Sequence, residues 1–197
     1  IVVWRGLGET LPVNRRVKRD FVSVLRNYLA LCGDRPYVAF TLANAFISAS
    51  MFAYITGSSF IFIRHFGLEP EQFAYVFGAN AFCFILGAQV NARLLRKFSG
   101  RRIMEVAMYV HLSGAIALLA VSHFASDAVV PFTASLFVLL TCGGFIGANA
   151  VAAAMSRASN NVGAAAALNG VVQFGMAAGA GAMVGLQCAC AYHDRPR

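Results

Sequence analysis

The chain has 197 residues, of which 59% are hydrophobic and only 12% are charged. A soluble globular domain carries about 25% charged residues, so this composition excludes a soluble globular protein and favours one that spans a membrane. The formal net charge of +8 would suggest a nucleic-acid partner in a soluble protein. Here the basic residues gather in short segments between apolar stretches, so we expect no nucleic-acid binding and relate the charge to membrane topology.

The beginning of the chain predicts the end of one helix followed by a basic linker. Residues 1–12 begin with the apolar run Ile1–Trp4 and end at Pro12, a residue that a helix interior does not tolerate. We interpret this run as the end of a preceding transmembrane helix and expect the chain to be part of a longer protein. Residues 13–36 contain six Lys or Arg and two Asp, with apolar residues at helical spacing. They predict an amphipathic helix on the cytoplasmic membrane surface.

The following residues predict an all-α membrane protein with about five transmembrane helices. Each apolar stretch is close to or longer than the roughly 20 residues that cross a bilayer. The predicted spans are residues 37–63, 73–95, 103–123, 129–155 and 163–186. The triplet Glu69-Pro70-Glu71 predicts the start of the second helix, since proline and acids suit a first turn. Residues 187–197 form an atypical tail whose composition does not resemble a membrane span.

Polar and small residues inside the spans predict where helices bend and pack. Thr41, Asn44 and Ser48 share one helical face, which must meet protein or a water-filled path because lipid would leave the amide unpaired. The sequence GSS at residues 57–59 predicts a kink or break near the end of the first span. Close packing in lipid is predicted at the small-residue pairs Gly143/Gly147, Gly175/Gly179 and Gly181/Gly185.

A short basic turn, residues 87–102, separates the second and third spans. Its basic residues are Arg93, Arg96, Lys97, Arg101 and Arg102, and no acid follows until Glu105. The two loops on the opposite side contain Arg64 as their one basic residue. Because Lys and Arg are retained on the cytoplasmic side, the turn is expected to face the cytoplasm.

The five cysteines are odd in number and do not have the spacing of a disulfide framework. We therefore predict no disulfide bonds. Cys188 and Cys190, with His193 nearby, are interpreted as residues of a helix end rather than as a metal site. No metal and no cofactor are predicted.

Several short motifs, in a characteristic order, resemble those of a known exporter family. They are ETLP (9–12) before the basic linker, YITGSSF (54–60), FGANA (77–81), NARL (91–94) with Arg101-Arg102, and GAAAAL (163–168) with QFG (173–175). Together they resemble the bicyclomycin-resistance (Bcr/CflA) subfamily of the major facilitator superfamily, over about residues 1–186. The motifs correspond to the junction after the family's sixth helix, its seventh helix, its eighth helix with the following loop, and its eleventh helix.

The resemblance implies twelve helices in two six-helix halves that export several drugs against an inward flow of protons. Residues 37–186 would be the C-terminal half-domain, with residues 187–197 in place of the twelfth helix. The implied location is a multi-pass position in a bacterial inner membrane. The implied partners are the lipid bilayer, an N-terminal transporter half, small-molecule drugs and protons. No Asp or Glu lies in the middle of a predicted span, so the proton-coupling acids are expected in the other half.

In this fold the substrate cavity lies between the two halves near the bilayer midplane. The cavity candidates are Asn44, Phe52, Tyr54, Asn80, Asn149 and Gln173, with hydrogen bonding or packing inside this half as the alternative for each. The candidates for a cytoplasmic gating loop are Asn91, Arg93, Arg101 and Arg102, and topology determination explains their charge equally well. His111, inside the third span, is expected to be a neutral histidine bonded to a neighbouring helix.

Two other functions stay open at this point. One is a non-functional remnant, or an accessory half-transporter that needs a partner chain. The remote one is an intramembrane protease, because His111-Leu112-Ser113-Gly114 is faintly similar to a nucleophile turn. That sequence lacks the glycine before the serine and a base partner on another helix. The chain is therefore predicted to be a transporter half and not an enzyme.

Overall fold

A computed structural model describes residues 21–158 and 162–193, and this part of the chain is helical apart from short turns. The helices are α2 (Phe21–Gly33), α3 (Arg35–Ser59) with a π-helical extension η2 (Phe60–His65), α4 (Pro70–Leu94), α5 (Gly100–Phe124), α6 (Val129–Arg157) and α7 (Val162–His193). Five of them are long and apolar enough to cross a membrane. The prediction of an all-α membrane protein is confirmed. The interpretation of residues 1–12, and that of residues 13–20 of the linker, lie outside the described residues.

The helix starts follow from local hydrogen bonding. The Asp34 carboxylate accepts a hydrogen bond of 3.4 Å from the Tyr37 backbone N–H at the start of α3. The backbone N–H of Glu69 donates to the Gln72 side chain at 3.1 Å, and α4 begins at Pro70, as predicted. The Ser99 hydroxyl accepts from the Arg102 N–H at the start of α5. These caps satisfy donors that the first helical turn leaves unpaired.

The predicted irregularity at residues 57–59 corresponds to the point where α3 becomes π-helical. Phe62, fully buried in this extension, packs its ring against Phe66, Phe73 and Phe132. The extension therefore packs against the first turns of α4 and α6.

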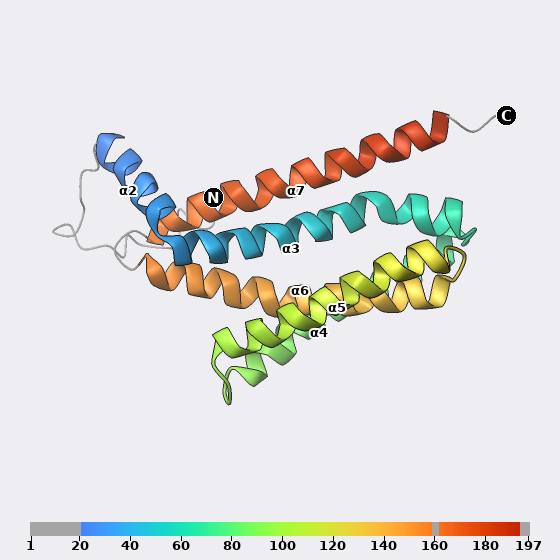
Figure 1. Cartoon of the computed structure of the whole chain (residues 1–197), viewed down its shortest axis with the longest axis horizontal. Helices are drawn as coiled ribbons and strands as arrows, with labels where there is room; N and C mark the ends of the chain where they lie inside the picture. The colour runs from blue at the N-terminus through green and yellow to red at the C-terminus, as the bar shows by residue number, and fades with distance from the viewer. Residues whose placement is uncertain (1–20, 159–161, 194–197) are drawn as a thin grey trace, which may run out of the picture.

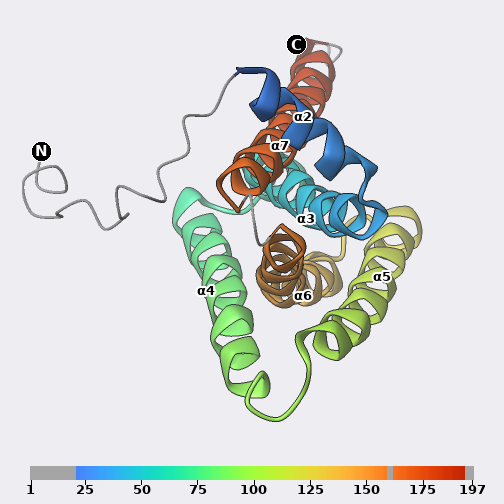
Figure 2. The ribbon, with the colours of Figure 1, turned by 90° about the vertical axis from the view of Figure 1, so that its left-hand side faces the viewer.

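The long helices run back and forth along the long axis of the molecule, which is horizontal in Figure 1. Helix α6 lies in the centre and packs against α3, α4 and α5, whereas α7 packs mainly against α3. Figure 2 shows α6 almost end-on, with α4 and α5 spreading apart on either side of it. The core lies along α6, which carries the largest share of buried residues among the five spans.

Glycine allows the closest helix approach at Gly87 of α4 and Gly144 of α6, neither of which belongs to a predicted small-residue pair. A Cβ atom on Gly144 would lie 2.6 Å from the Phe84 carbonyl oxygen, and one on Gly87 would collide with the Thr141 carbonyl. In the predicted pair Gly143/Gly147, a Cβ atom on Gly143 would meet Ile47 of α3 and Phe84 of α4, whereas one on Gly147 would meet only Asn44 of α3. The predicted close packing at Gly175/Gly179 is not made among the described helices, because a Cβ atom on either residue would meet no described atom within 4 Å. These two glycines face outward from α7.

Helix α7 is longer than the predicted fifth span. It continues through Gln187 to His193, and the apolar stretch that could cross a membrane reaches Cys190. Alanine and cysteine in residues 188–191 are small and compatible with a helix, so the tail expected from residue 187 is helical as far as His193. At the other end, the Tyr37 hydroxyl donates to the Ala165 carbonyl at 2.7 Å and Arg157 pairs with Asp34 at 3.2 Å. These bonds hold α3, α6 and α7 together.

Candidate functional site

An amide pair joins α3 to α7 inside the apolar spans. The Asn44 Nδ2 atom donates to Gln173 Oε1 at 3.0 Å, and the Asn44 side chain is 4% exposed. Two predicted cavity residues are thus brought together from opposite ends of the sequence. Neutral amides can exchange this bond for one to a ligand at little electrostatic cost, because no charge is left unpaired.

A second polar group lies between α3 and α4. The Tyr54 ring stacks on Phe77 with centroids 5.6 Å apart and 11° between planes, and its hydroxyl lies next to the Asn80 side chain. Asn80 is fully buried, and its Nδ2 atom donates to the Val76 carbonyl at 3.1 Å. The Tyr54 hydroxyl and Asn80 Oδ1 are buried without a hydrogen-bond partner among the described residues. Buried polar atoms normally have partners, so this pair can bind a further donor or acceptor.

Two further buried polar atoms line the seam between α3 and α7 and were not among the predicted site residues. Thr41 Oγ1 and Asn169 Oδ1 have no hydrogen-bond partner within the described part of the chain. The sequence carried a signal for both, since Thr41 precedes Asn44 on one face and Asn169 lies one turn before Gln173. The seam is therefore polar over several turns.

A cavity of about 500 Å³ adjoins Tyr54 near the end of the bundle that lies opposite the basic turn. Its lining includes Ser50 and Ser58 of α3, Leu140 of α6 and Gln187 of α7. The predicted cavity residue Phe52 is not part of this lining, and its side chain is 37% exposed on α3. Tyr54 therefore lies at a cavity, whereas Phe52 faces the outside of the described helices.

Asn149 forms a pair with a residue that was predicted for the gating loop. Its Nδ2 atom donates to Asn91 Oδ1 at 2.6 Å and to the Phe145 carbonyl at 2.8 Å. Both asparagines are buried, and a Cβ atom on Gly100 would lie 2.6 Å from Asn149 Oδ1. The pair thus connects α4, α6 and the start of α5 at the basic turn, on the side of α6 that faces α4 and α5.

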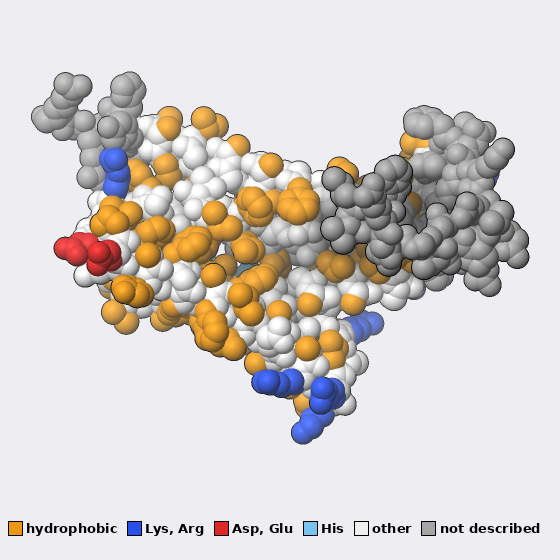
Figure 3. All heavy atoms as spheres, turned by 180° about the vertical axis from the view of Figure 1, so that it is seen from behind, with side chains coloured by type: hydrophobic (Ala, Val, Ile, Leu, Met, Phe, Trp, Pro, Cys, Tyr) orange, Lys and Arg blue, Asp and Glu red, His pale blue; other side chains and the backbone are white. Residues whose placement is uncertain are grey.

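The basic residues of the turn differ in their surroundings. Arg101 is paired with Glu105 at 2.9 Å, whereas Arg93 and Arg102 are exposed and make no ion pair with a described residue. Figure 3 shows Lys and Arg gathered at the protruding tip of this hairpin, next to a broadly apolar flank. The tip is thus a polar end on an apolar helix pair, as expected at a membrane surface.

The His111 and Ser113 side chains do not interact with each other in the described structure. The His111 Nδ1 atom lies 3.2 Å from the Leu139 carbonyl of α6, so this ring nitrogen carries the proton. The Ser113 hydroxyl donates to the Val110 carbonyl of its own helix at 2.8 Å. The described residues contain no group of three or more His, Cys, Asp or Glu that could hold a metal, and the five cysteines are free thiols.

Five apolar spans with buried amides between them define this chain as part of a multi-pass membrane protein. Residues 1–182 match the sequence family described as Major Facilitator Superfamily. The chain belongs to the major facilitator superfamily, whose members are transporters, and the predicted membership is confirmed. Membership of a transporter family agrees with the prediction that the chain is not an enzyme.

Most of this chain aligns with each of two curated relatives. The MFS-type transporter YdgK of Bacillus subtilis (strain 168) is 24% identical over 166 residues, which is 84% of this chain and 41% of that protein. A bicyclomycin resistance protein homolog of Haemophilus influenzae is 25% identical over 179 residues, which is 90% of this chain and 44% of that protein. The chain thus spans less than half the length of these relatives.

Proposed function

We propose that this chain forms the C-terminal half of a proton-coupled multidrug exporter in a bacterial inner membrane. The relative named for bicyclomycin resistance supports drugs as the transported compounds. The observation that carries the proposal is the pair of unpartnered polar atoms on Tyr54 and Asn80, buried within apolar spans. Such atoms are costly inside a membrane unless water or a ligand supplies a hydrogen bond.

The chemistry of Tyr54, Phe77 and Asn80 suits uncharged or weakly polar drugs. The stacked rings of Tyr54 and Phe77 offer an apolar surface, while Asn80 offers an acceptor. The middle of α3, α4 and α7 contains no charged residue. Small-molecule pockets combine a mainly apolar lining with a few placed polar groups. We assign Tyr54 and Asn80 to drug contact, and the Asn44–Gln173 pair to the coupling of α3 with α7.

The proton-coupling acids are proposed to lie in the complementary half. The acids of the described spans are Glu71, in the first turn of α4, and Glu105, in the second turn of α5, where it is paired with Arg101. An acid that couples transport to protons must reach the interior of the membrane. This half would then contribute drug contacts, and the other half would bind and release protons.

The gating role is proposed for the basic turn as a unit. Asn91, Asn149 and Gly100 hold α4, α6 and α5 together, so the turn can move as one body. Arg93 is exposed and makes no ion pair with a described residue. It is the group that we expect to pair with an acid of the complementary half when the cytoplasmic side closes.

The test is drug accumulation in a bacterium that lacks its own exporters and expresses the native gene from which this chain is translated. Ethidium and bicyclomycin should accumulate less than in cells with an empty vector, and a proton uncoupler should abolish the difference. Equal accumulation in both strains, with the protein present in the membrane, would reject drug export. A difference that survives the uncoupler would reject proton coupling.

An accessory half that assembles with a separate chain is the second candidate. It is favoured by the apolar face of α7, where Val171 is 72% exposed and Phe174 is 61% exposed. Together with the outward glycines Gly175 and Gly179, these residues form a surface on which another helix bundle can pack. A covalently linked half and a separate chain would both cover this surface, and the size of the native gene product distinguishes them.

A further inference from the structure

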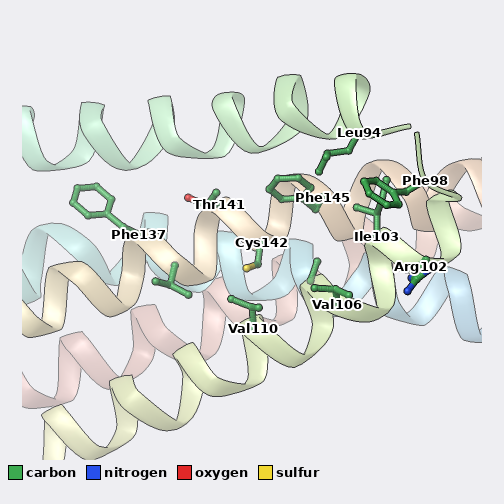
Figure 4. Close-up of a pocket in the computed structure, with 12 residues that line it drawn as sticks. Leu94, Phe98, Arg102, Ile103, Val106, Val110, Phe137, Thr141, Cys142 and Phe145 are labelled. Carbon is green, nitrogen blue, oxygen red and sulfur yellow. The ribbon is translucent and has the colours of Figure 1, made fainter. Parts of the chain in front are cut away.

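Helices α4 and α5 leave a groove between them over the surface of α6. Both pack on α6, but they diverge from the basic turn that joins them (Figure 2). The groove has a volume of about 640 Å³, which is within the range of about 300–1,000 Å³ for ligand pockets. Figure 4 shows side chains from α4, α5 and α6 pointing into it. The groove is separate from the polar group formed by Tyr54 and Asn80.

The lining of the groove is apolar along its length and basic at one end. Val106 and Val110 of α5 form one wall, 59% and 43% exposed, and Thr141 and Phe145 of α6 form the floor. Arg102 is the one charged residue of the lining, and it lies at the same end as Phe98 (Figure 4). A ligand that fits this pattern has a long apolar part and a single anionic end.

The length of the groove matches one leaflet of a bilayer. Arg102 and Val110 are eight residues apart on α5, which is about 12 Å along the helix axis. Half of a bilayer's hydrocarbon core is about 15 Å thick. With the basic turn at the cytoplasmic surface, the groove extends from the headgroup level towards the bilayer centre.

The charge around Arg102 favours an anionic headgroup. Arg101 is neutralised by Glu105, but the Arg102 guanidinium makes no ion pair with a described residue. Arg93, Arg96 and Lys97 are exposed on the same turn. Basic residues near the cytoplasmic leaflet attract anionic lipids, by about 1 kcal/mol for each Lys or Arg. We propose that this groove binds an anionic phospholipid, with one acyl chain between α4 and α5 and the phosphate at Arg102.

The test compares lipid retention in two matched pairs of variants. The protein is reconstituted with equimolar phosphatidylglycerol and phosphatidylcholine of identical acyl chains, extracted into detergent, and examined by native mass spectrometry. The unmodified protein should retain phosphatidylglycerol in preference to phosphatidylcholine. Arg102→Gln should lower that retention about fivefold, while Arg101→Gln, which removes the same charge from the neighbouring position, should leave it nearly unchanged.

The second pair tests the acyl-chain part of the groove. Val110→Trp fills the groove and should reduce retention of phosphatidylglycerol, whereas Leu112→Trp, on the same helix outside the lining and 57% exposed, should not. If Arg102→Gln and Arg101→Gln lower the retention of phosphatidylglycerol equally, surface charge alone explains the effect, and the proposal is overturned. Retention that is insensitive to Val110→Trp would also overturn it. So would a photo-crosslinker at position 110 that captures a polypeptide instead of lipid.

Discussion

The Tyr54 hydroxyl lies beside the Asn80 side chain but forms no hydrogen bond of standard geometry to a described residue. It is buried next to Asn80 without a hydrogen-bond partner, while its ring is held by Phe77. A structural residue in this position would be more stable as phenylalanine, because an unpaired buried polar group costs about 1–3 kcal/mol. A drug that hydrogen-bonds to this hydroxyl would remove that cost, which is the role that the proposed function gives to Tyr54.

Tyr54→Phe should accordingly slow drug export without destabilising the protein. We expect an unchanged or higher melting temperature in detergent, and a raised KM for export of a drug that donates or accepts a hydrogen bond. Tyr75→Phe, on α4 with Tyr75 79% exposed, is the matched control and should change neither quantity. A fall in melting temperature for Tyr54→Phe alone would show that the hydroxyl stabilises the fold.

Unlike the Tyr54 hydroxyl, the Asn91 and Asn149 side chains satisfy each other. Both amides are buried, and they are hydrogen-bonded at 2.6 Å. Asn91→Ala and Asn149→Ala should each destabilise the protein, and the double variant should lose less than the sum of the two. The expected coupling free energy is about 1 kcal/mol, within the range measured between transmembrane helices. Reversible unfolding of the four proteins gives this value. Additive losses would mean that the bond contributes no stability.

At the scale of the helices, the α4–α6 contact depends on the absence of a side chain at Gly144. Gly144→Ala would place a methyl group against the Phe84 carbonyl and the Ala88 nitrogen, at 2.6 and 3.0 Å before relaxation. We expect a loss of about 1–3 kcal/mol in unfolding free energy. Gly175→Ala meets no described atom within 4 Å, so it should be neutral or stabilise α7 by up to about 1 kcal/mol. The same unfolding measurement compares the two, and equal effects would contradict the assigned contact.

The spans themselves could be predicted because length and hydropathy dictate them. Local residue types also predicted three details: the start of α4 at Pro70, the irregular end of α3 and the basic turn. Helix rotation was not readable, because a lipid-facing surface and a packed one are equally apolar in a membrane protein. The outward position of Gly175 and the close approach at Gly144 therefore required the structure.

The candidate site was predictable to a similar extent. Amides in apolar helices must find partners, which identified Asn44, Gln173 and Asn149 as residues of interest. Which amide meets which depends on packing between helices far apart in sequence. For this reason Asn149, predicted for the cavity, is found bonded to Asn91 of the basic turn.

At the scale of the whole molecule, the distribution of charge predicts the topology. In a variant without native cysteines, Lys97→Cys places a thiol in the basic turn and Ser126→Cys places one in the turn between α5 and α6; both positions are exposed. A membrane-impermeant maleimide should label Ser126→Cys in intact cells and Lys97→Cys only in inverted vesicles. The reverse pattern would contradict the assignment of the basic turn to the cytoplasm.

The proposed exporter has two halves, and the described helices leave apolar surface on α7 for a second bundle to cover. The most direct measurement is the mass of the native gene product in its source membrane, detected with an antibody against residues 13–35. A two-half exporter should give a band near twice the 21.0 kDa of this chain, or a band of 21.0 kDa that copurifies with a second helical half. A 21.0 kDa chain that purifies as a folded monomer without a partner would contradict the account.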